Sequence, residues 1–465
     1  MRLLFLLPFI NMRLKKTFRR VLLVTAVFII VFIARYFYIS LPLISAFGAK
    51  TLCSSIYLQH RNSETVIKED LSGFPFSLAT YNVNNTDSSV SVNVFGFAEK
   101  KAIFRKRLGA TLINDFSEAE IRKQQFNIPS PPPDSINRRY ENNLSDNSLP
   151  YINKQQLDKI LQQEIYGNAD KPTTTRAIVI VHNGKLVAEK YAPGFSYSTV
   201  MPTWSANKSI TGCLIGILVK QGKLNIDAPA PVPQWAGTTK ASITIKQLLQ
   251  QTSGLDYHEN YLYPSEATIM LFKKGNMANY AEGLPLKYPP GTVFNYSSGN
   301  SNILSDIIKR TVGENDYTSF PYRELLYKIG MLSATLEPDA SGMYVGSSYC
   351  YATAHDFAKF GMFCLDNGKW NGEQILPDDW IQLSTQPSKA DPHQQYGMQF
   401  WLNGFDKPGS KKHQFPDVPG DMYYADGYGG QGIFIIPSKQ TVIVRLGLKK
   451  IDENKLIADI LSTLP

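Results

Sequence analysis

Cysteine and histidine are scarce in this chain, and their scarcity excludes two ways of building a site. Four cysteines in 465 residues are too few for a disulfide framework. Cys213 is expected to be a buried thiol in an apolar helix, and a pairing of Cys350 with Cys364 is left open. The six histidines show neither H-x-x-x-H nor H-x-H spacing, so the sequence predicts no metal site and no other cofactor.

Acidic residues are missing from the first 50 positions, which carry eight basic residues. Without those eight, 40 basic residues face 39 acidic ones, so a formal net charge of +9 falls to +1. Domains that bind nucleic acids usually present a strongly basic face. The nearly neutral remainder therefore gives no support to nucleic-acid binding, and its length allows a large core and more than one domain.

Charged residues are also missing from positions 21–49, with Arg35 as the one exception. A span of about 20 apolar residues crosses a bilayer, so 21–49 is a predicted transmembrane anchor that follows a basic cytoplasmic segment, 1–20. The positive-inside rule places the rest of the chain on the periplasmic side of the inner (cytoplasmic) membrane. The basic residues before the span are Lys15, Lys16, Arg19 and Arg20. The alternative is a signal peptide cleaved near Ala46-Phe-Gly48, with secretion of the remainder.

Beyond the anchor, the composition divides the chain into three parts. Residues 51–125 contain short alternating runs, such as 89–95, and are predicted to form a small β-containing extension. Residues 126–150 are rich in proline, asparagine and serine, which is typical of a linker. Residues 151–465 form the predicted main domain.

The main domain has predicted strands at both of its ends. A hairpin at 176–191 follows a helix at 152–166, and its Asn183-Gly184 turn is a strong hairpin signal. Strands at 432–436 and 441–447 precede a helix at 453–463. This order favours an α/β (α+β) fold, in which one antiparallel sheet is flanked by helices and a helical lobe is inserted between its strands.

A serine and a lysine lie three residues apart at the start of an apolar helix predicted for 205–221. Residues at this spacing share a helix face, so the amine of Lys208 can approach the hydroxyl of Ser205. A serine hydroxyl becomes a good nucleophile when a neighbouring base takes its proton. The alternative is a capping serine followed by a solvated lysine.

Further motifs follow in order. A P-G-T-V-F turn precedes Tyr296-Ser-Ser298, a strand carries Ala425-Asp-Gly427, and segment 243–255 reads ITIKQLLQQTSGL. From about residue 172 onward, the chain resembles serine hydrolases of the class C β-lactamase and penicillin-binding family. The residues after the T-S-G turn are most similar to the branch of 6-aminohexanoate-dimer (nylon oligomer) hydrolases.

The resemblance implies roles for individual residues. Ser205 is the expected nucleophile, and Tyr296 is the expected proton acceptor for Ser205 and donor to the leaving group. Lys208 is expected to supply the cation that favours a phenolate at Tyr296 and, partly desolvated, to lose its own proton more easily than a free lysine. Tyr140 and Tyr151 also begin Y-x-N matches, but they lie upstream of the nucleophile and are rejected. The pair His355-Asp356 is expected to be structural.

Two of the motifs depart from the family pattern. Ser298 stands where the lactamases carry an asparagine that binds substrate, and Asp426 stands in a motif that normally supplies a lysine or histidine. That cation receives the carboxylate of penicillins and D-Ala-D-Ala peptides, which Asp426 would repel. The main-chain N–H of Tyr428, after Gly427, is a candidate for the oxyanion hole together with that of Ser205. Tyr261 is a further candidate for substrate binding.

We therefore expect an exported, membrane-anchored serine hydrolase that acts through an acyl-enzyme on a small ester, amide or peptide-like substrate. The alternatives are a β-lactam- or peptidoglycan-binding sensor with little turnover, a true β-lactamase, and a scaffold without activity.

Overall fold

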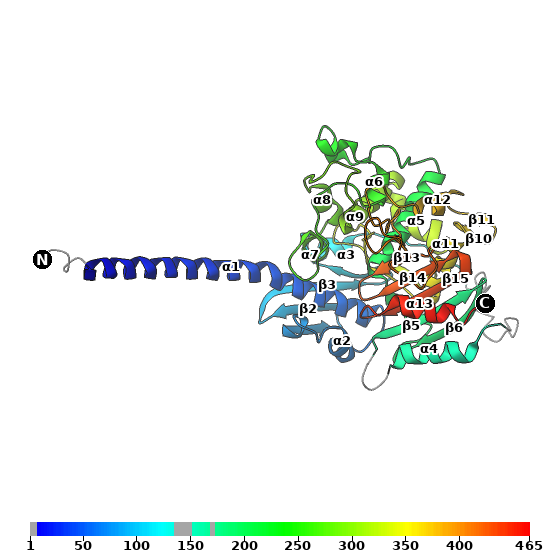
Figure 1. The fold of residues 1–465 in the computed structure, drawn as a ribbon, viewed down its shortest axis with the longest axis horizontal. Helices are drawn as coiled ribbons and strands as arrows, with labels where there is room; N and C mark the ends of the chain where they lie inside the picture. Colours follow the sequence, from blue (N-terminus) through cyan, green and yellow to red (C-terminus); the bar gives the residue numbers. More distant parts are fainter. Residues whose placement is uncertain (1–6, 134–150, 168–172) are drawn as a thin grey trace.

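The computed structural model describes residues 7–133, 151–167 and 173–465, with side chains from residue 18 onward. Most of the predicted linker, the rejected Tyr140 and the basic side chains before residue 18 lie outside the described residues. A single helix, α1 (Leu7–Tyr57), projects from the folded body like a rod (Figure 1). Within the described part of the chain, this is the one helix long and apolar enough to cross a membrane.

The main sheet has six antiparallel strands in the order β12-β13-β14-β15-β5-β6. These are β12 (Trp401–Leu402), β13 (Tyr423–Gly427), β14 (Gln431–Ile436), β15 (Thr441–Gly447), β5 (Thr175–His182) and β6 (Lys185–Tyr191). Asn183 and Gly184 both have positive φ (50° and 71°), as the predicted tight hairpin requires. Strands from both ends of the main domain thus meet in one sheet.

Helices cover both faces of this sheet. On one face, α4 (Lys154–Tyr166) and α13 (Glu453–Leu461) bury their apolar stripes against Ile178 and Ile443. The other face contacts α11 (Ala354–Leu365), where Gly361 lies directly against Val442. Every residue of β5 and β15 is buried, because both of their faces are covered.

The helical lobe is inserted between β6 and β12, and its central helix is α5. Its helices are α5 (Asn207–Lys220), α6 (Ile245–Leu249), α7 (Glu266–Lys273), α8 (Met277–Glu282), α9 (Ser298–Val312) and α10 (Glu314–Tyr317). Short elements complete the body: β7 (Met201–Pro202), β8 (Thr335–Leu336), β9 (Cys350–Ala352), β10 (Lys369–Trp370), β11 (Glu373–Gln374) and α12 (Trp380–Ser384). The predicted fold class, an antiparallel sheet flanked by helices with an inserted helical lobe, is confirmed.

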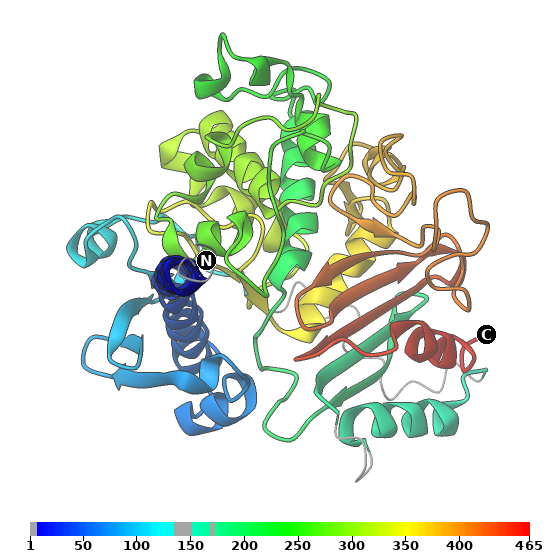
Figure 2. The ribbon, with the colours of Figure 1, turned by 60° about the vertical axis from the view of Figure 1, so that its left-hand side comes forward.

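The N-terminal extension packs around the second half of α1. It comprises α2 (Ser63–Asp70), the four-stranded sheet β1 (Ala79–Asn84), β2 (Ser89–Val94), β3 (Phe97–Arg105) and β4 (Gly109–Leu112), and α3 (Glu118–Lys123). Figure 2 shows this blue extension on one side of α5 and the six-stranded sheet on the other.

Helix α1 does not stop where the anchor was expected to end. It continues without a break to Tyr57, and Leu43, Ala46 and Ala49 are buried in the protein core, whereas the anchor was predicted to reach residue 49. Small residues permit this packing: a side chain at Gly48 would come within 2.9 Å of the Tyr81 ring. Protein interior and lipid are equally apolar, so hydrophobicity alone does not mark the transition between them.

Ionic contacts at two places join the extension to the main domain, among the residues that the structure describes. Lys50 of α1 forms a buried ion pair with Glu337, which also accepts hydrogen bonds from Ser54 (2.8 Å) and the backbone N–H of Ala110 (2.7 Å).

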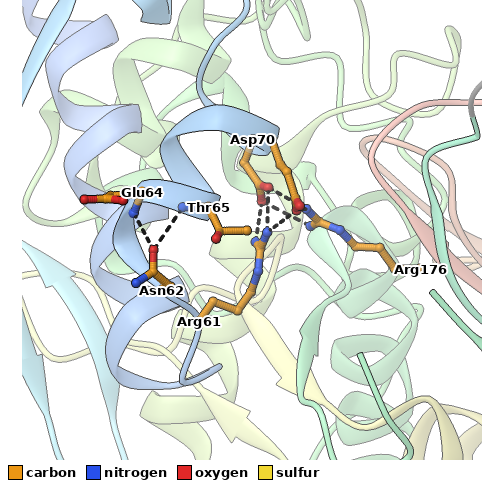
Figure 3. A network of polar contacts seen from close by, with 7 residues as sticks. Arg61, Asn62, Glu64, Thr65, Asp70 and Arg176 are labelled. Atoms are coloured by element: carbon orange, nitrogen blue, oxygen red, sulfur yellow. Dashed lines mark hydrogen bonds and ion pairs between the residues drawn. The ribbon is translucent and has the colours of Figure 1, made fainter. Parts of the chain in front are cut away.

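The second contact is centred on Asp70, at the end of α2 (Figure 3). Its carboxylate lies between the guanidinium groups of Arg61 and Arg176, the latter on β5. Burial by itself would raise the pKa of Asp70, but the hydrogen bonds from Arg176 and Arg61 hold it below its ordinary value. Figure 3 also shows Asn62, whose side chain caps the first turn of α2.

The cysteines and His355 have structural positions. All four thiols are free and buried, so Cys350 and Cys364 are not paired. His355 Nε2 lies 2.6 Å from a carboxylate oxygen of Glu189, and Asp356 accepts hydrogen bonds from Ser333.

Candidate active site

Ser205 lies in a short 3₁₀ turn, Trp204–Ala206, that leads directly into α5. The preceding residue, Trp204, has φ +49°, a left-handed conformation that is unfavourable for a bulky side chain. Such strain concentrates at functional sites, where the surrounding structure holds it in place. Here Thr203 helps to fix the turn, because its backbone N–H and its hydroxyl both donate hydrogen bonds to the carbonyl of Cys350. Ser205 is thereby presented, half-buried, at the positive end of a helix.

Lys208 is buried immediately behind Ser205, with 1% of its surface exposed. Its Nζ lies 2.9 Å from Ser205 Oγ, 3.0 Å from Ser298 Oγ and 3.2 Å from the carbonyl oxygen of Ser347. Burial lowers the pKa of Lys208 to about 8, while Glu259 and Asp426 act to raise it. The amine is therefore close to the serine and is partly unprotonated near neutral pH.

Tyr296 lies in the loop just before α9. Gln251 fixes this loop: its carbonyl accepts from the N–H of Asn295 (2.8 Å), and its side chain accepts from the N–H of Ser297 (3.2 Å). The Nζ of Lys208 stands 4.7 Å from the centre of the Tyr296 ring, over its face. Burial, the nearby Tyr396 and Glu259 raise the pKa of Tyr296 well above 10, against a polar contact with Ser205 that lowers it.

These positions change the expected division of labour between the two residues. A resting phenolate at Tyr296 is disfavoured, because burial raises its pKa and the lysine faces its ring. Lys208 is the group whose pKa burial brings towards neutrality. The geometry thus favours Lys208 as the base and Tyr296 as a hydroxyl donor.

Strand β13 closes one side of the site. Gly427 packs so tightly on the nucleophile turn that a Cβ there would stand 1.9 Å from the carbonyl oxygen of Thr203. The ring of Tyr428 is half-exposed and meets Trp204 edge-on, with 5.7 Å between ring centroids. Glycine at 427 therefore permits the close approach of β13 to the turn that carries Ser205.

Asp426 does not stand alone. Its carboxylate lies 3.2 Å from Lys450 Nζ, a partner that the sequence analysis did not identify. Burial raises the pKa of Asp426, whereas Lys450 and Lys208 lower it. Among the described residues, its second oxygen, Oδ1, has no hydrogen-bond partner. Lys450 therefore offsets part of the negative charge expected at this place.

Ser298 lies beside the amine of Lys208. It is fully buried as the first residue of α9, and its hydroxyl contacts both Lys208 and Glu259. The substrate-binding role that its motif position implies stays a prediction. Its contacts hold the amine of Lys208 in place.

Glu259 was missed as a site residue by the sequence analysis. It accepts hydrogen bonds from the backbone N–H of Ser298 (2.8 Å), the Ser298 hydroxyl (2.6 Å) and the Tyr261 hydroxyl (2.5 Å). Tyr261 in turn lies 6.0 Å from Tyr428, ring to ring, at the exposed edge of the site. The available signal was the position of Glu259 two residues before Tyr261, in the segment that carries the family resemblance.

The structure thus gathers the predicted residues into one cluster. Around Ser205 lie Lys208, Tyr296, Ser298, Asp426, Gly427 and Tyr428, with Tyr261 at the edge. No group of three or more histidine, cysteine or acidic side chains suited to a metal ion occurs in the portions of the chain that the structure covers. Fold and cluster together define the class of serine hydrolases of the amidase and esterase kind.

Comparison with known proteins is consistent with this class. Residues 167–452 match the family model described as Beta-lactamase, and the chain belongs to that family. A 6-aminohexanoate-dimer hydrolase from Paenarthrobacter ureafaciens is 24% identical over 298 residues, which cover 59% of this chain and 72% of the relative.

Solved structures share the fold. A family VIII carboxylesterase has a TM-score of 0.53 at 14% identity, covering 67% of this chain and 97% of the esterase. A penicillin binding protein from Bacillus halodurans has a TM-score of 0.50 at 17% identity, covering 66% and 99%. The resemblance predicted from the motifs is confirmed.

Proposed function

We propose that this protein hydrolyses ester or amide bonds through an acyl-enzyme on Ser205. Lys208 acts as the base that accepts the serine proton, and Tyr296 donates a proton to the leaving group. The main-chain N–H groups of Ser205 and Tyr428 stabilise the oxyanion. The observation that carries this proposal is the buried amine of Lys208, 2.9 Å from Ser205 Oγ and with a pKa of about 8.

The reaction then follows in two halves. With Lys208 as free amine, Ser205 Oγ attacks the substrate carbonyl and transfers its proton to Nζ. The C–O or C–N bond breaks, the alcohol or amine leaves with the proton of Tyr296, and the acyl group stays on Ser205. The ammonium of Lys208 then returns its proton to Tyr296 and is again a free amine. Water, deprotonated by the same amine, releases the acid and regenerates the serine. Glu259 and Ser298 hold Lys208 in place throughout.

We further propose that the preferred substrates lack a carboxylate beside the scissile bond. Asp426 stands where the family pattern has a cation, and Lys450 neutralises it only in part. The relatives named above, an amide-dimer hydrolase and a carboxylesterase, support an amide or ester substrate. A β-lactam-binding sensor and a true β-lactamase remain the competing candidates, because both would use the same Ser205 and Lys208.

We propose that the N-terminal helix is a retained membrane anchor. Cleavage after Gly48 would cut inside an unbroken helix and remove Leu43 and Ala46 from the core. The basic residues at its start favour a cytoplasmic N-terminus and a hydrolase on the opposite, periplasmic side. The extension within 51–125 packs against α1. The main domain, from residue 151 onward, contains the proposed catalytic residues.

Covalent labelling tests these alternatives. The purified protein and Ser205→Ala would be treated with a fluorophosphonate probe and with a fluorescent penicillin. We expect fluorophosphonate labelling that Ser205→Ala abolishes, and rapid turnover of a neutral ester. Stable penicillin labelling without turnover would identify a sensor, fast penicillin hydrolysis would identify a β-lactamase, and labelling of neither kind would exclude the proposed chemistry.

A further inference from the structure

The exposed part of α1 matches the thickness of a bilayer. Residues 18–38 are exposed at every position except Ala26, which is half-exposed. Arg19 and Arg20 precede the apolar part, residues 21–38, in which Arg35 is the one charged residue. At 1.5 Å per residue these 18 residues span about 27 Å, close to the roughly 30 Å of a hydrocarbon core. Tyr36, Phe37 and Tyr38 end this stretch, where aromatic side chains favour the interface. The membrane boundary on the side of the folded body therefore lies near Tyr38.

The buried part of the same helix touches the nucleophile turn. The ring of Phe47 stacks on Trp204, with centroids 6.0 Å apart and planes within 3°, and Trp204 precedes Ser205. At the far end of α1, the side chain of Gln59 donates to the carbonyl of Val200 (2.9 Å). The chain from Val200 to Trp204 thus runs beside α1, back toward its membrane end. Ser205 lies at the level of Phe47.

This contact sets the height of the active site. Nine residues separate Tyr38 from Phe47, a rise of about 13.5 Å along an unbroken helix. The headgroup layer occupies about 5–7 Å of that height. The nucleophile therefore stands within about 10 Å of the outer surface of the headgroups, a distance that the polar part of a membrane amphiphile can bridge.

Exposed apolar side chains lie at one end of the small sheet, on one side of the point where α1 leaves the body. Val94 pairs with both Ala79 and Phe97, so the start of β1 and the β2–β3 turn share one end of the small sheet. Figure 1 shows this end directed toward the projecting half of α1. We name its exposed side chains the apolar rim: Phe74, Leu78, Phe95 and Phe97. Such a patch, continuous with an apolar helix, is typical of a surface that contacts lipid.

The helix is also fixed against rotation. Lys50 is paired with Glu337 in the interior, and Ser54, one turn further on, donates to the same carboxylate. The helix continues through Pro42 to Tyr57. Because its buried half is bonded to the main domain, the height and facing of the site follow from the position of α1 in the bilayer.

We propose that the enzyme acts on membrane-resident amphiphiles whose ester or amide bond lies in the polar headgroup, about 10–15 Å above the acyl chains. This inference rests on the proposed acyl-enzyme chemistry and on the retained anchor. The headgroup C–O or C–N bond breaks, the acyl fragment is transferred to Ser205, and water releases it as the acid.

Two substrates that carry the same ester test the inference with the full-length protein in vesicles of phosphatidylcholine and phosphatidylglycerol. One is methylumbelliferyl butyrate in solution. The other is phosphatidylethanolamine whose amine carries a methylumbelliferyl ester through a succinyl spacer. We expect the wild type to hydrolyse both esters. A seven-residue helical insertion after Tyr38 should slow hydrolysis of the lipid-borne ester only. The insertion raises the site by about 10 Å and turns it by only about 20°.

The expected loss is about tenfold or more on the lipid-borne ester, with the soluble ester unchanged within about twofold. The same insertion after Thr17, on the other side of the span, is the matched control and should alter neither rate. Phe95→Ser combined with Phe97→Ser provides a second variant in case the insertion disturbs folding, and should likewise slow only the lipid-borne ester. Tyr166→Ser, on α4 far from the helix exit, is its control.

The outcomes separate this inference from the proposed function. Hydrolysis of the lipid-borne ester that neither the insertion nor the paired phenylalanine variant reduces would overturn it, while the hydrolase proposal stands. Failure of the wild type to cleave the lipid-borne ester, with good cleavage of the soluble one, would overturn it too. Failure on both esters, without Ser205 labelling, would refute the proposed function itself.

Discussion

The acylation rate should follow the ionisation of Lys208. With a pKa of about 8, about a tenth of the lysine is free amine at pH 7, half at pH 8 and about nine-tenths at pH 9. If the free amine accepts the serine proton, kcat/KM should rise about tenfold between pH 7 and pH 9 and then level off. An ordinary exposed lysine would give a rise that continues beyond pH 10.

Replacing Glu259 tests the same reasoning in the other direction. The carboxylate of Glu259 acts to raise the pKa of Lys208. Glu259→Gln retains a side chain able to hydrogen-bond with Ser298 but removes the charge. The midpoint of the pH profile should therefore move to lower pH. Glu69→Gln is the control: Glu69 lies on the distant α2, so this variant leaves the site untouched and should leave the midpoint unchanged. Gln251→Glu would not serve as a control, because Gln251 holds the Tyr296 loop.

The assay is the second-order rate of fluorophosphonate labelling of Ser205 between pH 6 and pH 10, corrected for spontaneous hydrolysis of the probe. Labelling isolates acylation from deacylation and from product release. A flat profile across pH 7–9, or a midpoint in Glu259→Gln that moves upward, would refute Lys208 as the base.

Three further outcomes follow from the structure. Tyr296→Phe should reduce kcat/KM for a neutral ester by about 10² to 10⁴ without loss of secondary structure by circular dichroism, and a rate within a few-fold of wild type would remove it from the mechanism. Asp426→Asn should improve kcat/KM for a penicillin relative to a neutral ester by about fivefold, or about 1 kcal/mol, because Lys450 offsets part of the charge and the substitution removes the rest. Steady-state kinetics on both substrates would measure the ratio, and an unchanged ratio would contradict the charge argument. Asp70→Asn should lower the free energy of unfolding in urea by about 2–3 kcal/mol, because it leaves two buried guanidinium groups with the half-exposed Glu69 as their remaining carboxylate. Since the pKa of Asp70 is lowered in the folded state, its stabilisation is complete above the ordinary aspartate range and is lost as the pH falls through the lowered value, so the variant and wild type should converge in acid.

The nucleophile and the outline of the fold could be predicted because their signals are local. The spacing of Ser205 and Lys208 fixes their contact on one helix, and the Asn183-Gly184 turn fixes a hairpin. The order of the predicted strands and motifs along the chain then indicated a helical lobe inserted between the strands of the sheet. Each of these inferences depends on residues within a few positions of one another, or on the resemblance to the family.

The missing parts of the site depend on contacts between distant residues. Glu259 reaches Ser298 across 39 positions, and Lys450 reaches Asp426 across 24. No local sequence pattern distinguishes Glu259 or Lys450 from the other charged residues of the chain. The motif position of Ser298 suggested contact with substrate, but the contact of its buried hydroxyl with Lys208 could not be predicted from that position.

Burial also explains why the roles of Lys208 and Tyr296 could not be assigned from sequence. Both side chains lie in the same cluster beside Ser205, and desolvation disfavours whichever form is charged. For the lysine this lowers the pKa, so the basic amine becomes available; for the tyrosine it raises the pKa, so the basic phenolate becomes unavailable. One physical cause therefore acts in opposite chemical directions on the two residues. The sequence places both beside Ser205, but only their burial determines which of them can accept its proton.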